Sequence, residues 1–116
     1  MRFKNKTVII TGAAGGIGRQ TGLSFAKEGA NVAVSDLDFD MAKRVADEII
    51  TSGGVAEAFK LDVTNQNETI DVMKNAYQHF GGLDIAFCNA GIREIVSPLE
   101  LSIEEWRKVI DINVTG

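Results

Sequence analysis

Short apolar runs alternate with longer amphipathic stretches along the whole chain. The apolar runs predict buried strands at 7–11, 31–35, 55–61 and 83–88, and the first of them consists of β-branched residues alone. Between them, apolar residues recur at helical spacing and predict helices, the first from Ile17 to Glu28. This strict alternation predicts an α/β fold with a doubly wound parallel sheet of about four strands and helices on both faces.

Local signals mark the helix boundaries. Gly29 follows the predicted first helix directly, at the position where glycine commonly ends a helix, and Asp38 is placed to cap the start of the next helix. Asn65 with Glu68, and Ser102 with Glu105, have the spacing of capping boxes that open the third and last helices. The apolar residues of the third helix are expected to form its buried face, so its tyrosine is assigned to the core; they are Ile70, Met73, Ala76, Tyr77 and Phe80.

Length and charge limit the classes of function. The 116 residues are enough for one domain, 1–116, and the net charge of −4 leaves no basic surplus for nucleic acid or for an anionic membrane surface. No stretch is apolar enough to span a membrane, and Cys88, the single cysteine, excludes an intrachain disulfide and is expected to be a buried thiol. We expect a cytoplasmic protein with no metal site.

A glycine-rich turn joins the first strand to the first helix. It contains Gly12, Gly15, Gly16 and Gly18, with Ile17 before the last glycine. Free backbone N–H groups and the positive end of the helix bind phosphate at such a place, and glycine lets the backbone approach it closely. The turn therefore predicts a site for the pyrophosphate of a dinucleotide on a Rossmann-type sheet, although an ordinary tight turn would have the same glycines.

An acidic residue stands at the end of the second strand. Asp36 lies 18 residues beyond Gly18, close to the spacing of a carboxylate that binds the ribose hydroxyls of a dinucleotide. Such a carboxylate repels a 2′-phosphate, and Leu37 stands where an arginine would meet one, so NAD is expected over NADP. Two alternatives stay open: Asp36 caps the following helix, or Asp38 takes either role.

Four segments in order resemble the classical branch of the short-chain dehydrogenase/reductase family. Thr11 to Gly18 has the form Thr-Gly-x-x-x-Gly-x-Gly of its glycine motif. Asp62-Val63 resembles the pair that contacts adenine, and Asn89-Ala90-Gly91 resembles the motif that ends the fourth strand. Asn113 resembles the active-site asparagine of the next helix. The resemblance covers the chain from residue 7 to its end.

The side-chain chemistry of each of these segments also supports an interpretation of its own. The Asp62 carboxylate is suited to accept a hydrogen bond from the adenine amino group, or else to cap the turn at 64–65. The side chain of Asn89 is able to bridge neighbouring strand ends, while Ala90 and Gly91 leave room beside a cofactor. Asn113 is unfavourable inside a helix, which indicates either a kink or a functional demand; a solvent-facing asparagine is the alternative.

The resemblance implies an oxidoreductase that transfers a hydride between a nicotinamide cofactor and a small alcohol or carbonyl substrate. That family also uses a serine and a Tyr-x-x-x-Lys pair, whereas the only tyrosine here, Tyr77, is followed four positions later by Gly81. Family subunits are roughly twice as long, so the chain is expected to be a truncated N-terminal half that is inactive alone. Its open sheet edge and half-covered last helix predict association with either another copy or the missing half, and a homo-oligomer is expected.

Substrate contacts and two other classes of function stay open. Only the stretch 92–96 is placed to reach a substrate, where Arg93 would meet an anionic group or form a solvated surface with Glu94. A non-catalytic nucleotide-binding or oligomerisation module would share the dinucleotide site. A methyltransferase with another adenosine cofactor would share the glycine turn and acid, but would not explain Asn89-Ala90-Gly91 or Asn113.

Overall fold

The computed structural model describes residues 1–93 and 96–116, and it contains a four-stranded parallel sheet. The sheet order is β3-β2-β1-β4, and the strands are β1 (Thr7–Ile10), β2 (Asn31–Asp36), β3 (Val55–Lys60) and β4 (Ile85–Phe87). The helices are α1 (Gly16–Lys27), α2 (Phe39–Thr51), α3 (Gln66–Phe80) and α4 (Ile103–Ile110), followed by a π-helical turn at Asp111–Thr115. The predicted α/β fold with a parallel sheet is confirmed.

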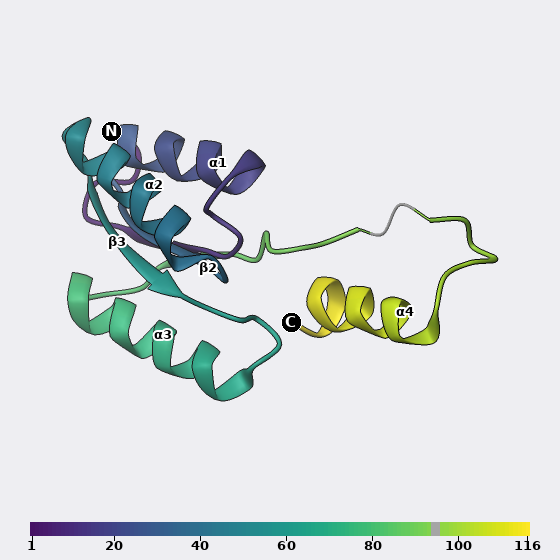
Figure 1. Cartoon of the computed structure of the whole chain (residues 1–116). Coiled ribbons are helices and arrows are strands. Elements are labelled where there is room, and N and C mark those ends of the chain that lie inside the picture. Colours follow the sequence, from purple (N-terminus) through teal and green to yellow (C-terminus); the bar gives the residue numbers. More distant parts are fainter. Residues whose placement is uncertain (94–95) are drawn as a thin grey trace.

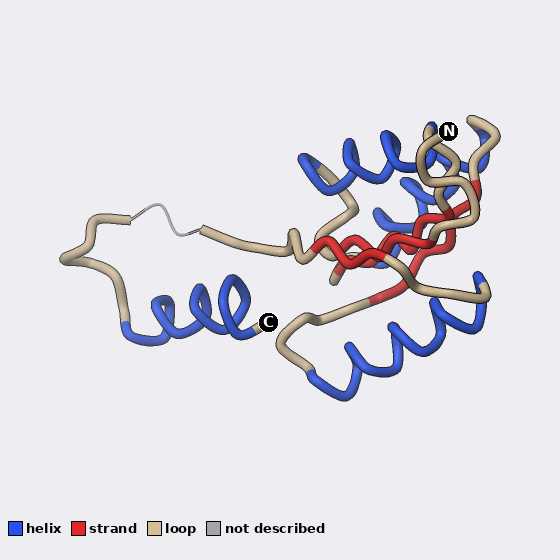
Figure 2. The backbone as a smooth tube through the Cα atoms, turned by 180° about the vertical axis from the view of Figure 1, so that it is seen from behind, coloured by secondary structure: helices blue, strands red, loops and turns tan. Residues whose placement is uncertain are grey.

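Two apolar layers hold the sheet between its helices. Alternate strand residues point to opposite faces, so Val8 and Ile10 pack with the buried side of α2, while Ile9 packs on the other face with Val72 and Ala76 of α3. Figure 1 shows α1 and α2 together on one face and α3 alone on the other, and Figure 2 shows the same three layers from behind. Helices on both faces are therefore confirmed.

The capping signals are confirmed with one exception. Gly29 has a φ of +90° beyond the end of α1, and the Asp38 carboxylate accepts the Met41 N–H at 3.1 Å at the start of α2. Ser102 and Glu105 form both hydrogen bonds of the capping box that opens α4. At α3 only half of the expected box forms, because the Glu68 side chain accepts from the Asp62 N–H instead of the Asn65 N–H.

The prediction that Tyr77 belongs to the core is wrong. Its side chain is 58% exposed, because α3 presents Val72 and Ala76 to the sheet and leaves Tyr77 on its outer flank. Ile70 and Met73 are exposed for the same reason, whereas Phe80 packs against the core cluster on that face. The spacing of apolar residues correctly placed Ala76 on the buried face of α3, but it missed Val72 and wrongly included Tyr77.

The expected burial of Cys88 is also wrong. Cys88 is exposed, because it follows β4, the strand at the edge of the sheet, and the described residues leave that edge open. An apolar sequence context predicts burial only where a neighbouring strand or helix covers the residue. The apolar run 83–88 yields a strand of three residues, Ile85–Phe87.

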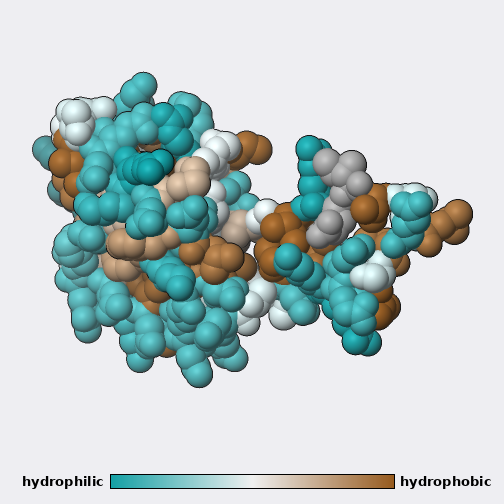
Figure 3. Space-filling view, in the orientation of Figure 1, coloured by the Kyte–Doolittle hydropathy of each residue, from teal (hydrophilic) through white to brown (hydrophobic). Residues whose placement is uncertain are grey.

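The chain beyond β4 forms an arm that ends close to the carboxyl edge of the sheet. The arm runs outward, turns, and returns through α4 toward the loop between β3 and α3 (Figure 1). None of the α4 residues is buried, and apolar atoms show on the surface of this arm in Figure 3. Among the described residues, no helix has both the length and the apolar character needed to cross a membrane.

Candidate functional site

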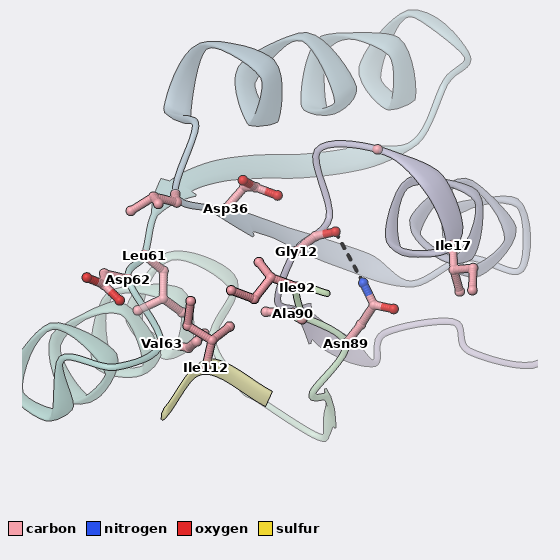
Figure 4. Close-up of a pocket in the computed structure, with 13 residues that line it drawn as sticks. Gly12, Ile17, Asp36, Leu61, Asp62, Val63, Asn89, Ala90, Ile92 and Ile112 are labelled. Atoms are coloured by element: carbon pink, nitrogen blue, oxygen red, sulfur yellow. Dashed lines mark hydrogen bonds between the residues drawn. The ribbon is translucent and has the colours of Figure 1, made fainter. Parts of the chain in front are cut away.

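A cavity of about 470 Å³ lies where the carboxyl ends of the strands meet. The loops that follow all four strands contribute to its walls, together with the turn after α4 (Figure 4). This is the edge at which open α/β sheets bind ligands. Most of the residues predicted for the site line it: Gly12, Gly15, Ile17, Asp36, Leu37, Asp62, Val63, Asn89, Ala90 and Gly91.

Two glycines of the turn are required by close packing. Gly12 has a φ of +63°, and a Cβ there would lie 2.8 Å from the Ala90 Cα. A Cβ on Gly18 would overlap the Gly12 carbonyl oxygen and lie 2.7 Å from the Asn89 Nδ2. The end of β1, the start of α1 and the end of β4 therefore approach one another only because these two positions carry no side chain.

Gly15 is different, because the protein itself leaves its side-chain space empty. No atom of the residues that the structure describes would lie within 4 Å of a Cβ there, and the position lines the cavity. No side chain among the described residues caps the start of α1, and the first N–H bonded back in that turn is that of Arg19, to the Gly15 carbonyl at 3.1 Å. The N–H groups that precede Arg19 in the first turn of α1 have no partner within the helix and point out of its cavity end, where binding of an anion is favoured.

The Asp36 carboxylate links the end of β2 to the glycine turn. One oxygen accepts the Ala14 N–H at 3.1 Å and the other accepts the Asp38 N–H at 3.0 Å. The alternative that Asp36 caps α2 is wrong, because the Met41 N–H bonds to Asp38. Asp36 is therefore held at the cavity wall (Figure 4) with lone pairs left for a ligand hydroxyl.

Asp62 belongs both to the cavity wall and to a turn. One carboxylate oxygen accepts the Thr64 hydroxyl at 2.6 Å and the Thr64 N–H at 3.0 Å. These hydrogen bonds hold the pKa of the Asp62 carboxyl below its ordinary value, with a smaller contribution from the charge of Lys60. The residue is ionised at neutral pH, and its second oxygen accepts no hydrogen bond from the residues that the structure describes.

Thr11 and Asn89 join the ends of β1 and β4. The Thr11 hydroxyl accepts the backbone N–H groups of Asn89 and Ala90, both at 3.0 Å. The Asn89 amide donates to the carbonyl oxygens of Thr11 at 3.1 Å and Gly12 at 3.2 Å, the latter drawn in Figure 4. Asn89 thus makes the bridge between strand ends that its side chain suggested, and the glycine turn is fixed relative to β4.

Asn113 lies in the π-helical turn and binds the loop that follows β4. Its side-chain oxygen accepts the Ile92 N–H at 2.8 Å, and its nitrogen donates to the Ile92 carbonyl at 2.7 Å. The amide therefore pairs with the backbone of Ile92 as a neighbouring strand would. This pairing accounts for an asparagine in the helix, together with the local departure from α-helical geometry at Asp111–Thr115.

Two apolar residues that the sequence did not single out also line the cavity, Leu61 and Ile112, together with Ile92 from the stretch 92–96. Figure 4 shows Ile112 beside Leu61 and Val63, away from the glycine turn. Leu61 and Ile112 carry no polar or charged group that would have marked them in the sequence, although each is next to a residue that was predicted. Four of the predicted residues do not line this cavity: Thr11, Gly16, Gly18 and Asn113. Of the stretch 92–96, Arg93 is exposed, and Glu94 and Ile95 lie outside the described residues.

The sequence matches known proteins over almost its whole length. The family model of the short chain dehydrogenases matches residues 6–116. Cyclohexanol dehydrogenase of Acinetobacter sp. strain SE19 is 45% identical over 99% of this chain and 46% of its own length. 3beta-hydroxysteroid dehydrogenase 1 of Eggerthella lenta is 42% identical over 98% of this chain and 44% of its own length. The chain thus spans about half the length of these relatives.

Solved structures agree with the sequence matches. A short-chain type dehydrogenase/reductase from Mycobacterium marinum has a TM-score of 0.94 and 39% identity, over 97% of this chain and 46% of that one. A hydroxysteroid dehydrogenase from Escherichia coli has a TM-score of 0.91 and 35% identity, over 98% and 48% of the two chains. With the family model matching most of its residues, the chain belongs to the short-chain dehydrogenase family.

Proposed function

We propose that this chain forms the cofactor-binding part of an NAD-dependent oxidoreductase that acts on an alcohol or carbonyl substrate. The observation that carries the proposal is that the uncapped start of α1 and the Asp36 carboxylate open onto one cavity, next to the empty side-chain space of Gly15. The relatives support the reaction type, since they are named as dehydrogenases of cyclohexanol, of a 3β-hydroxysteroid and of galactitol.

The cavity offers a separate set of groups to each part of a dinucleotide. The N–H groups at the start of α1 would bind the pyrophosphate, and Asp36 would accept from the ribose hydroxyls. Asp62 would accept from the adenine amino group, with Leu37 and Val63 as the apolar walls of that subsite. Ala90 and Gly91 would leave room for the nicotinamide half, which supplies hydride transfer when the cofactor is bound.

The choice of NAD over NADP is tested at Asp36. Calorimetric titration of the chain should give tighter binding of NAD than of NADP, because the carboxylate repels a 2′-phosphate. Asp36→Asn keeps an oxygen for the Ala14 N–H but removes the charge, and should reduce this preference by about tenfold or more. Asp40→Asn, which removes an exposed charge from the first turn of α2, is the matched control and should leave the preference unchanged.

A chain that bound NADP as tightly as NAD would contradict the assignment of the cofactor. A chain that bound neither dinucleotide would contradict the proposed function itself. Titration with S-adenosylmethionine separates the methyltransferase alternative, which predicts binding of that compound in place of NAD.

For Asn113 we propose a role in positioning the cavity wall. Because its amide oxygen and nitrogen both bind the backbone of Ile92, it fixes the loop that carries Ala90, Gly91 and Ile92 along one side of the cavity. From the family resemblance, the same residue is expected at the active site. In this geometry its contribution to the chemistry passes through the position of that loop.

A homo-oligomer is the remaining part of the proposal. Ile103 and Trp106 of α4 are each 56% exposed and Leu99 is 97% exposed, which is a large apolar surface for one short arm. We expect the light-scattering mass to rise with protein concentration, and Trp106→Lys to reduce that rise. Ile50→Lys, a change of an exposed apolar residue on α2, serves as the control, and a strictly monomeric chain at high concentration would contradict the prediction.

A further inference from the structure

The side chain of Glu68 makes a contact that the helix it belongs to does not need. Asn65 caps α3 by itself, since its side-chain oxygen accepts the Glu68 N–H at 3.0 Å. The Glu68 carboxylate reaches past this cap to the backbone N–H of Asp62, which it binds at 2.9 Å. A capping box would instead direct that carboxylate to the Asn65 N–H, which here donates to the Asp62 carbonyl at 3.0 Å.

Glu68 and Thr64 together hold Asp62 at two points. Thr64 binds one carboxylate oxygen through its hydroxyl and its N–H, and so sets the direction of the side chain. Glu68 binds the backbone N–H of the same residue and sets the position of the main chain. A hydrogen bond to a carboxylate is stronger than one to a neutral acceptor, so this is a firm attachment of the loop between β3 and α3.

The held residue lies between two side chains of the cavity wall. Leu61 and Val63 on either side of Asp62 line the cavity, as does Asp62 itself, whereas Glu68 does not. Within the part of the chain that the structure describes, the second carboxylate oxygen of Asp62 accepts no hydrogen bond. The side-chain contact that links Glu68 to the cavity wall is its hydrogen bond to Asp62.

We propose that Glu68 is a positioning residue for recognition of the purine base, acting by fixing the main chain of Asp62 so that its unbonded carboxylate oxygen meets an amino group of the base. This inference rests on the proposed function, in which Asp62 accepts from the adenine amino group. A carboxylate fixed in this way selects a base that presents a hydrogen-bond donor at that position over one that presents an oxygen. Base selectivity is therefore the quantity that Glu68 controls.

The test compares two dinucleotides that differ in that one group. The purified chain is titrated calorimetrically with NAD and with nicotinamide hypoxanthine dinucleotide, which has an oxygen in place of the adenine amino group. Glu68→Ala should weaken NAD binding about three- to tenfold and change binding of the hypoxanthine compound by less than about twofold, since a single oriented hydrogen bond is lost. Glu68→Gln keeps an oxygen acceptor and should restore most of the selectivity.

Two further variants make the result specific. Asn65→Ala removes the cap of the same helix without removing the Glu68 contact, so it should lower the melting temperature and leave the ratio of the two dissociation constants unchanged. Asp62→Ala should abolish the selectivity, and Glu68→Ala in that background should then have no additional effect on it.

Each contrary outcome has a distinct meaning. If Glu68→Ala weakens both dinucleotides equally, Glu68 only stabilises the helix and the inference is wrong, while the proposed function stands. If Asp62→Ala leaves the selectivity unchanged, the assignment of the adenine subsite fails and the inference fails with it. If the unaltered chain binds neither dinucleotide, the proposed function fails.

Discussion

Replacing Gly15 with valine is expected to weaken NAD binding by on the order of 100-fold while leaving the fold intact. The backbone at Gly15 is extended, with a φ of −165°, and a Cβ would meet no atom of residues 1–93 and 96–116 within 4 Å. The protein therefore tolerates a side chain at this position, but the side chain would fill the space proposed for the pyrophosphate at the start of α1. Calorimetry measures the loss of affinity, and circular dichroism measures the retention of fold.

Gly82→Val is the matched control for this variant. A Cβ at Gly82 would also have no atom within 4 Å in the described part of the chain, but the residue follows α3 and does not line the cavity. It should bind NAD as the unaltered chain does. Tight NAD binding by the Gly15 variant would mean that the phosphates lie elsewhere, and the proposed site would be wrong.

Replacing Gly18 with alanine is expected to lower the free energy of unfolding by about 2–3 kcal/mol. The added methyl group would overlap the Gly12 carbonyl oxygen and lie 2.9 Å from the Ala13 Cα, both of which are backbone atoms that move only with the whole turn. The melting temperature should fall by on the order of 10 °C for a domain of this size. Thermal unfolding followed by circular dichroism measures the effect.

Gly22→Ala in the same helix gives the opposite expectation. Its Cβ would lie 3.6 Å from Ile10 Cδ1 and from Val32 Cγ1, which is an ordinary contact, and alanine is the better helix former. This variant should be as stable as the unaltered chain or slightly more stable. Equal losses at Gly18 and Gly22 would show that α1 tolerates no side chain on this face, and would contradict the specific role assigned to Gly18.

The strands and the start of most helices could be predicted because their signals are local. A β-branched run such as 7–11 favours a strand wherever it lies, and Asp38 or Ser102 caps a helix through atoms two or three residues away. The rotation of a helix about its axis is not local. The prediction for Tyr77 was wrong because Val72 and Ala76 pack against the sheet instead. Only the position of α3 over β1 and β3 decides which side of the helix is buried.

The polar part of the candidate site was predictable for a different reason. In a parallel sheet the carboxyl ends of the strands share one edge, so Asp36, Asp62 and Asn89 were expected to meet there once the strands were assigned. The apolar walls were not predictable in this way. Leu61 and Ile112 resemble ordinary core residues, and Ile112 reaches the cavity only because the arm returns α4 to the same edge.

The sequence by itself determined the order of strands and helices along the chain, the glycine turn at the start of α1 and the acidic residues at the strand ends. These features follow from periodicity and from contacts within a few residues. Tertiary structure decided what each side chain binds: the Asp38 carboxylate caps α2 while Asp36 holds the glycine turn, and Glu68 binds Asp62. Such choices depend on which segments distant in the chain come within hydrogen-bonding distance, and only the packed sheet brings them there.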